Sequence, residues 1–184
     1  MIIEFDFTQN ANRSQILDTL LAAMADSQRV QFDDAIHHAE VPEHHHHHLS
    51  DVYQSIDGLA VSQQVKDDMY AVYGILAQAE ATVHGCSVEE THFHEVGNAS
   101  GIRNALAICL AFEVLSPEQV IATPVQAGKG TIECAHGVLE VPAPATAAIL
   151  DQGIPVCEQR LEGERCTPTS AALIKHFVQE FRTV

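Results

Sequence analysis

The stretch IRNALAICLAFEVL, at residues 102–115, predicts the helix around which the chain folds. Apolar residues fall on almost every side of a helix built from these letters, as is typical of a helix buried inside a protein. Other elements must therefore cover it. Of the 184 residues, 46% are hydrophobic, which is enough to enclose this helix in a single domain over residues 1–184. The same apolar surface would also allow burial against a second copy, so a homo-oligomer stays open.

Hydrophobic spacing predicts the elements on either side of this helix. Apolar residues alternate with polar or acidic ones over residues 2–7, as in a strand, and Asn12 or Ser14 would cap a following helix. Residues 30–36 would return as a second strand. Further along we expect helices over 62–84 and 145–150, strands over 120–125, 138–141 and 154–157, and a last helix capped by Thr169 or Ser170 that reaches Phe181. These elements predict an α/β or α+β fold, with a short mixed sheet packed against three to four substantial helices.

Acidic residues dominate the charge, with 25 Asp and Glu against 9 Lys and Arg and a net charge of −16. Such a surface repels phosphate backbones and anionic lipids, so we expect no nucleic-acid and no membrane partner. It attracts cations, although solubility alone would also explain it. The first ten residues, MIIEFDFTQN, lack a basic segment followed by an apolar run, and nowhere do about 20 apolar residues follow one another. We therefore expect a cytoplasmic protein.

Residues 37–49 break the pattern, because this segment has no periodic apolar face and contains His44, His45, His46, His47 and His48 in an unbroken run. We predict a mobile His-rich loop within the domain. Imidazole is a ligand that suits nickel, zinc and copper. Five consecutive rings cannot all point at one site, but they can pass an ion among several weak sites, as a shuttle or reservoir requires. A purification tag is the alternative, although tags usually have six histidines and lie at a terminus.

The segment THFHEVG, at residues 91–97, holds a second histidine pattern. In an extended chain His92 and His94 would point to the same face and could bind one metal ion, whereas two exposed strand histidines would look the same. Glu95 would point the other way unless the chain bends at Gly97. His84, at a helix end, could be a third ligand or a helix cap.

Weaker signals occur further along the chain. His136 lies in a short turn between two predicted strands, and the backbone and charge of Lys129, between two glycines, could approach a phosphate. Thr167 and Thr169 open a helix whose N-terminus could bind an anion, although an ordinary N-cap with proline in the first turn explains the same letters. The five cysteines are scattered and read as buried small side chains, with Cys134 as a candidate ligand.

The order of these motifs is more informative than any one of them. A His tract is followed by AEATVHG (79–85), THFHEVG, the long apolar helix, GKG (128–130), AHG (135–137), VPAPAT (141–146) and TPTSAAL (167–173). Over residues 44–173 the chain resembles the N-terminal half of the LarC family, the nickel-insertion proteins of nickel-pincer (lactate racemase) cofactor biosynthesis.

The resemblance implies CTP-dependent insertion of nickel into a pyridinium bis-thiocarboxylate mononucleotide, with Mg²⁺ or Mn²⁺ accompanying the CTP. The His tract would hold or deliver nickel, and His92 and His94 would form the metal site. Glu95 or His136 would act as the base that takes the ring proton. Lys129, Thr167 and Thr169 would contact the substrate phosphate.

The chain departs from the family pattern in several places. Ser100 and Asn104 stand where the family carries two aspartates, Ser170 and Glu140 replace a usual glycine and proline, and the first turn lacks glycine. The family's C-terminal nucleotide-binding half has no counterpart in these residues. We therefore expect complete insertion to need a separate nucleotide-binding subunit. A nickel store or chaperone without catalysis, or a diverged inactive paralogue, are the alternatives.

Overall fold

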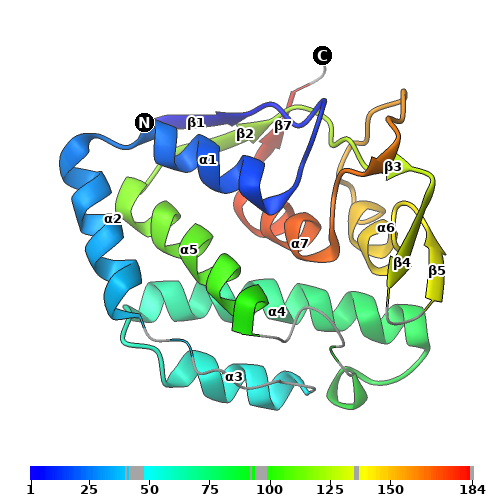
Figure 1. The fold of residues 1–184 in the computed structure, drawn as a ribbon, viewed down its shortest axis with the longest axis horizontal. Helices are drawn as coiled ribbons and strands as arrows, with labels where there is room; N and C mark the ends of the chain where they lie inside the picture. Colours follow the sequence, from blue (N-terminus) through cyan, green and yellow to red (C-terminus); the bar gives the residue numbers. More distant parts are fainter. Residues whose placement is uncertain (40, 42–47, 92, 94–98, 135–136, 183–184) are drawn as a thin grey trace.

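The computed structural model describes residues 1–39, 41, 48–91, 93, 99–134 and 137–182 (Figure 1). In chain order the described elements are β1 (Ile2–Phe5), α1 (Arg13–Ala23), α2 (Asp26–His38), α3 (Leu49–Asp57), α4 (Gln63–His84), the 3₁₀ helix η1 (Val88–Glu90), α5 (Ala99–Leu115), β2 (Gln119–Ala122), β3 (Gly128–Lys129), β4 (Thr131–Cys134), β5 (Gly137–Glu140), α6 (Pro144–Leu150), β6 (Gly163–Glu164), α7 (Pro168–Phe177) and β7 (Glu180–Phe181). None of the described helices is long and apolar enough to cross a membrane.

Three short parallel strands form the main sheet, with β2 between β1 and β7. Helices α1, α5 and α7 lie beneath this sheet, and the long α4 runs below them (Figure 1). Buried and exposed side chains alternate along β1 because of this arrangement. Ile3 and Phe5 face the helices and are buried, whereas Ile2 is 51% exposed. The sheet therefore has one packed face, to which the helices contribute the core.

The stretch at residues 102–115 is helical and buried, as predicted. It forms most of α5, which packs against α1, α2 and α4 and buries Ile102, Leu106 and Cys109 completely. The next strongest prediction, the helix over 62–84, is also confirmed: Ser62 caps α4 by accepting a hydrogen bond from the Val65 amide at 3.2 Å, and Gly85 ends it with a positive φ of 64°.

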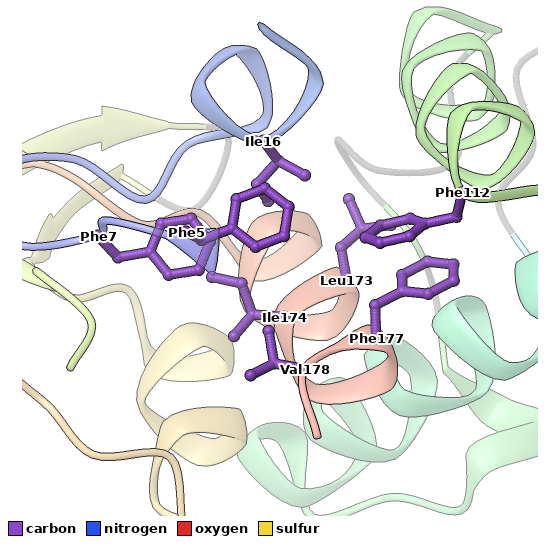
Figure 2. A pocket seen from close by; sticks show the side chains of 8 residues that line it. All are labelled: Phe5, Phe7, Ile16, Phe112, Leu173, Ile174, Phe177 and Val178. Atoms are coloured by element: carbon purple, nitrogen blue, oxygen red, sulfur yellow. The ribbon is translucent and has the colours of Figure 1, made fainter. Parts of the chain in front are cut away.

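Stacked phenylalanines fill the space between the sheet and the helices. Phe5 stacks on Phe7 with ring centroids 5.1 Å apart, and Phe112 stacks on Phe177 at 3.8 Å. A small hollow remains among these four rings and the side chains of Ile16, Leu173, Ile174 and Val178 (Figure 2). Its lining is wholly apolar, so it offers no group that could recognise a phosphate or a metal ion.

The predicted fold class is confirmed, but residues 26–38 form helix α2 and not the expected return strand. Phe32, Ala35 and Ile36 are spaced i, i+3, i+4, so they meet the core on one face of a helix. A strand would have required alternation, and Val30, which suggested it, is 65% exposed.

Other differences concern the number and the ends of elements. The described residues form seven α-helices; five of them were predicted, three to four as substantial helices, and α2 and α3 were missed. The strands divide into the parallel sheet and two antiparallel pairs, β3–β6 and β4–β5, and do not form one mixed sheet. The last helix ends at Phe177, so Phe181 belongs to β7, and residues 154–157 contribute only a bridge between Val156 and Val125.

The expected loop over residues 37–49 is described at its two ends and at Val41, which is buried. His37 and His38 complete the last turn of α2, and His48 precedes the first turn of α3. Residues 40 and 42–47 lie outside the described part, so the mobility of this segment stays a prediction.

We predict that Gly128→Ala destabilises the chain by about 3 kcal/mol or more, since the new Cβ combines left-handed strain with a steric overlap. Gly128 has a φ of +83°, and an added Cβ would lie 2.0 Å from the Gly163 carbonyl oxygen. Gly153→Ala is the matched control, because Gly153 also has a positive φ but nothing within 4 Å of an added Cβ. Urea unfolding should show a loss of about 1–2 kcal/mol for the control. Equal losses in the two variants would contradict the close approach.

Candidate functional site

The side-chain amide of Gln126 lies at the centre of the candidate site, buried to 2% exposure. Its oxygen accepts hydrogen bonds from the backbone amides of Gly128 at 3.1 Å and Leu161 at 3.2 Å. Its nitrogen donates to the carbonyl oxygens of Thr8 at 3.3 Å and Gln159 at 2.9 Å. One amide thus joins three segments that are far apart in the sequence, with all its partners on the backbone.

These segments meet at the carboxyl ends of the parallel strands. The Phe7 amide donates to Thr123 Oγ1 at 2.8 Å, which joins the chain after β1 to the chain after β2. The Ala11 amide donates to the Arg165 carbonyl oxygen at 2.8 Å, so the entry to α1 lies beside the entry to α7. Open α/β proteins bind ligands at this edge of the sheet, where loops emerge and helices begin. We therefore regard this carboxyl edge as the candidate functional site.

Lys129 lies at this edge, and hydrogen bonds to β6 and to the chain before it fix its backbone. Its amide donates to the Leu161 carbonyl oxygen at 2.9 Å, and β3 pairs with β6 through Lys129 and Gly163. Its Nζ lies 3.0 Å from Oε1 of Glu162, and Arg165 Nε donates to the Glu162 carbonyl oxygen at 2.9 Å. Two of the nine basic residues in this acidic chain therefore contact one residue. We call Lys129, Glu162 and Arg165 the basic cluster.

Thr167 is the N-cap of α7, which supports the simpler of its two interpretations. Its Oγ1 accepts a hydrogen bond from the Ser170 amide at 3.3 Å, and Pro168 occupies the first turn. Thr169 is only 3% exposed. The roles of Lys129, Thr167 and Thr169 as phosphate contacts stay predictions.

Asp6 and Cys157 also lie at the carboxyl edge, and the sequence drew no attention to either. Hydrogen bonds from the hydroxyl of Thr8 at 2.6 Å and from its amide at 2.9 Å hold the pKa of Asp6 below its usual value. The Cys157 thiol donates to the Pro124 carbonyl oxygen at 3.3 Å, and burial raises its pKa. Cys157 is therefore a neutral thiol at neutral pH. The Cys157 contact spans 33 positions and depends on the fold, whereas the contact between Asp6 and Thr8 is a local turn that the sequence could have indicated.

Most of the predicted nickel ligands lie outside the described residues. This holds for the predicted ligands His44 to His47, His92 and His94, and also for the candidate bases Glu95 and His136. His48 is described: it is exposed, and its backbone amide donates to Asp51 Oδ2 at 3.3 Å. Within the described part of the chain no group of three or more His, Cys, Asp or Glu side chains could hold a metal ion. The metal site therefore stays a prediction.

The two residues on either side of His92 are firmly packed. Thr91 and Phe93 are 1% and 2% exposed, and the Phe93 ring meets that of Tyr73 edge to face with centroids 6.0 Å apart. His84 lies in the last turn of α4 with Nε2 3.5 Å from Oε2 of Glu80. Both of its interpretations remain open.

The buried cysteines behave as the sequence predicted. Cys109 and Cys166 are fully enclosed in the core. Burial raises the pKa of Cys166 to about 12, so its thiol stays protonated at neutral pH. Cys86 and Cys157 are only half-buried.

Comparison with known proteins places this α/β chain in a family. A family model described as nickel insertion protein matches residues 6–184. The chain belongs to this family, which confirms the resemblance seen in its motifs.

Three relatives carry the name pyridinium-3,5-bisthiocarboxylic acid mononucleotide nickel insertion protein. The chain is 41% identical over 146 residues to the protein of Desulfitobacterium hafniense, covering 79% of this chain and 36% of that protein. It is 41% identical over 132 residues to that of Staphylococcus saprophyticus, covering 72% and 34%. It is 41% identical over 144 residues to the protein of Geobacillus kaustophilus, covering 78% of this chain and 35% of that protein. The chain spans about a third of the length of these relatives. No solved structure matches it.

We predict that Gln126→Leu lowers the free energy of unfolding by about 3 kcal/mol or more, because four backbone groups lose their partner in a buried place. Gln152→Leu is the control: Gln152 is exposed and donates one hydrogen bond, to the Ala148 carbonyl oxygen. Urea denaturation of that variant should show a change within about 0.5 kcal/mol. A Gln126→Leu chain as stable as the control would mean that the amide does not hold the three segments together.

Proposed function

We propose that this chain takes part in inserting nickel into pyridinium-3,5-bisthiocarboxylic acid mononucleotide, the precursor of a nickel-pincer cofactor. One observation carries the proposal: the chain belongs to the nickel insertion protein family over residues 6–184, and relatives 41% identical to it are named for this substrate. Nickel is the cargo of the reaction, and the mononucleotide is its acceptor.

The histidines suit the delivery of nickel to such an acceptor. Imidazole nitrogens bind nickel well, whereas the thiocarboxylate sulfurs of the precursor are softer ligands that can take the ion over. We assign collection of nickel to His44 to His48, and its presentation to the precursor to His92 and His94. Packing of Phe93 on Tyr73 supports the second assignment, since it ties that stretch to the long helix α4.

Formation of the nickel–carbon bond displaces a proton from the pyridinium ring, so a base must accept that proton. We assign this role to Glu95 or His136. Lys129 is a suitable contact for the phosphate of the mononucleotide, because its side chain is 54% exposed on a held backbone. Thr167 and Thr169 fit that role less well, since the first caps α7 and the second is buried.

Activation by CTP with Mg²⁺ or Mn²⁺ belongs to the same proposal, with a nucleotide-binding subunit as the partner that supplies it. A cytoplasmic location would give the chain access to such a subunit.

Ser100 and Asn104, which replace two aspartates of the family pattern, are the residues that would limit catalysis by this chain. The second candidate is a nickel store or chaperone, which the run of five histidines favours.

The test combines nickel stoichiometry with the absorption spectrum of the nickel–precursor complex. We predict that replacing His44 to His48 by alanine removes most of the weakly bound nickel, as measured by equilibrium dialysis. The charge-transfer band that forms with the nucleotide-binding subunit, precursor, CTP and Mg²⁺ should persist at saturating nickel. Replacing His92 and His94 by alanine should abolish this band. His37→Ala/His38→Ala, at the exposed end of α2, is the control that removes imidazoles elsewhere.

Each other outcome has a distinct meaning. Several weakly bound ions without a precursor-dependent band would favour the store or chaperone. An intact band in the His92→Ala/His94→Ala variant would move the metal site elsewhere. A chain that binds no nickel would be a diverged paralogue, and the proposal would be wrong.

A further inference from the structure

We propose that the basic cluster of Lys129, Glu162 and Arg165 is a phosphomonoester site in which the Glu162 carboxylate occupies the place of the phosphate in the free chain. The proposal deepens the proposed function and rests on it for the identity of the natural ligand, a mononucleotide with a terminal phosphate. The site itself is defined by contacts among described residues, independently of nickel.

The position of the Glu162 carboxylate shows where an anion fits. Its Oε1 lies 3.0 Å from Lys129 Nζ, and its Oε2 would lie 3.6 Å from a Cβ added at Gly130. The carboxylate thus lies between an ammonium group and a stretch of backbone that carries no side chain. Glycine-rich turns of this kind let anions approach the main chain closely.

Arg165 adds the second cation. Its Nε donates to the Glu162 carbonyl oxygen at 2.9 Å, and that bond uses one of the five N–H donors of the guanidinium group. The remaining face of a guanidinium suits two oxygens of a phosphate at once. Lys129 and Arg165 therefore both contact Glu162, the first through its carboxylate and the second through its carbonyl oxygen.

The backbone under this cluster is arranged before any ligand arrives. The Lys129 amide is bound to the Leu161 carbonyl oxygen, and the Leu161 amide is bound to the buried Gln126 side chain. The β3–β6 pairing also joins Lys129 to Gly163, the residue that follows Glu162. Little order must be gained on binding, so a small ligand loses little affinity to reorganisation.

Charge explains why an internal carboxylate would be useful. The chain carries a net charge of −16, and an exposed cation such as Lys129 without a nearby anion would attract its acidic side chains. The Glu162 carboxylate pairs with Lys129 locally, but it is 78% exposed and such surface pairs are weak. A phosphate dianion carries more charge and more acceptor oxygens than a carboxylate, so it can displace Glu162. Simple carboxylates and phosphodiesters, with one charge, should not.

The test measures binding of ribose 5-phosphate to the full chain by titration calorimetry at low salt, with ribose as the ligand control. We expect Glu162→Gln to bind ribose 5-phosphate about three- to tenfold more tightly than the parent chain, because the competing anion is gone. Lys129→Gln and Arg165→Gln should each weaken binding about tenfold, the loss of one charge-assisted hydrogen bond. Glu158→Gln, an exposed glutamate of the same loop, removes the same charge and should change affinity little.

The outcomes decide the proposal. It is overturned if ribose 5-phosphate fails to bind, if Glu162→Gln binds no more tightly than the parent, or if Glu158→Gln tightens binding equally. Circular dichroism checks that each variant is folded, and all four side chains lie at the surface. Failure of the proposed function looks different: the nickel–precursor band would be absent while ribose 5-phosphate still binds in the expected order. A normal band in a chain that does not bind ribose 5-phosphate would remove only the phosphate site.

Discussion

The buried amide of Gln126 is the interaction on which the carboxyl edge of the sheet depends. Its four hydrogen bonds use both lone pairs of the oxygen and both hydrogens of the nitrogen, and all four partners are backbone groups. Backbone groups in loops are costly to bury without partners. By satisfying them, one side chain allows three irregular segments to pack closely where regular secondary structure ends.

The constraint extends outward from this amide to the surface. Gly128 must be glycine, because its backbone touches that of Gly163 and adopts a positive φ. The close approach in turn sets Lys129 opposite β6 and beside Glu162 and Arg165. Buried packing and surface charge at this edge are therefore parts of one arrangement. A cation cluster stands out there because the rest of the chain is strongly acidic.

The basic cluster and the histidine motifs, the two candidate regions for function, require different things of the fold. A phosphate contact needs fixed donors, which the β3–β6 pairing and Gln126 supply. Delivery of a metal ion needs ligands that bind and release, which a run of imidazoles can supply without a fixed geometry. Phe93, which lies between His92 and His94 in the sequence, packs on Tyr73 of α4. Membership of the nickel insertion family is consistent with both demands within one chain.

Local patterns were enough for the helices that bury a clear face. The apolar run of 102–115 and the capped helix ending at Gly85 could be read directly, because periodicity, N-caps and left-handed glycines act over a few residues. The order of short motifs was likewise enough to indicate the family. The strand predicted over residues 30–36 was wrong, because its few apolar residues fit both a strand and a helix. Packing of Phe32 against the core decided for the helix.

The candidate site could not be read in the same way. Gln126 contacts Thr8 across 118 positions and Leu161 across 35, and an isolated glutamine carries no sign of either partner. Glu162 looked like one of 25 acidic residues until the fold placed it between Lys129 and Arg165. The sequence by itself determined the buried helices and the histidine motifs, whose signals are local. Only the tertiary structure decided which polar groups meet at the carboxyl edge, since hydrogen bonds and ion pairs between distant segments depend on how the chain returns to itself.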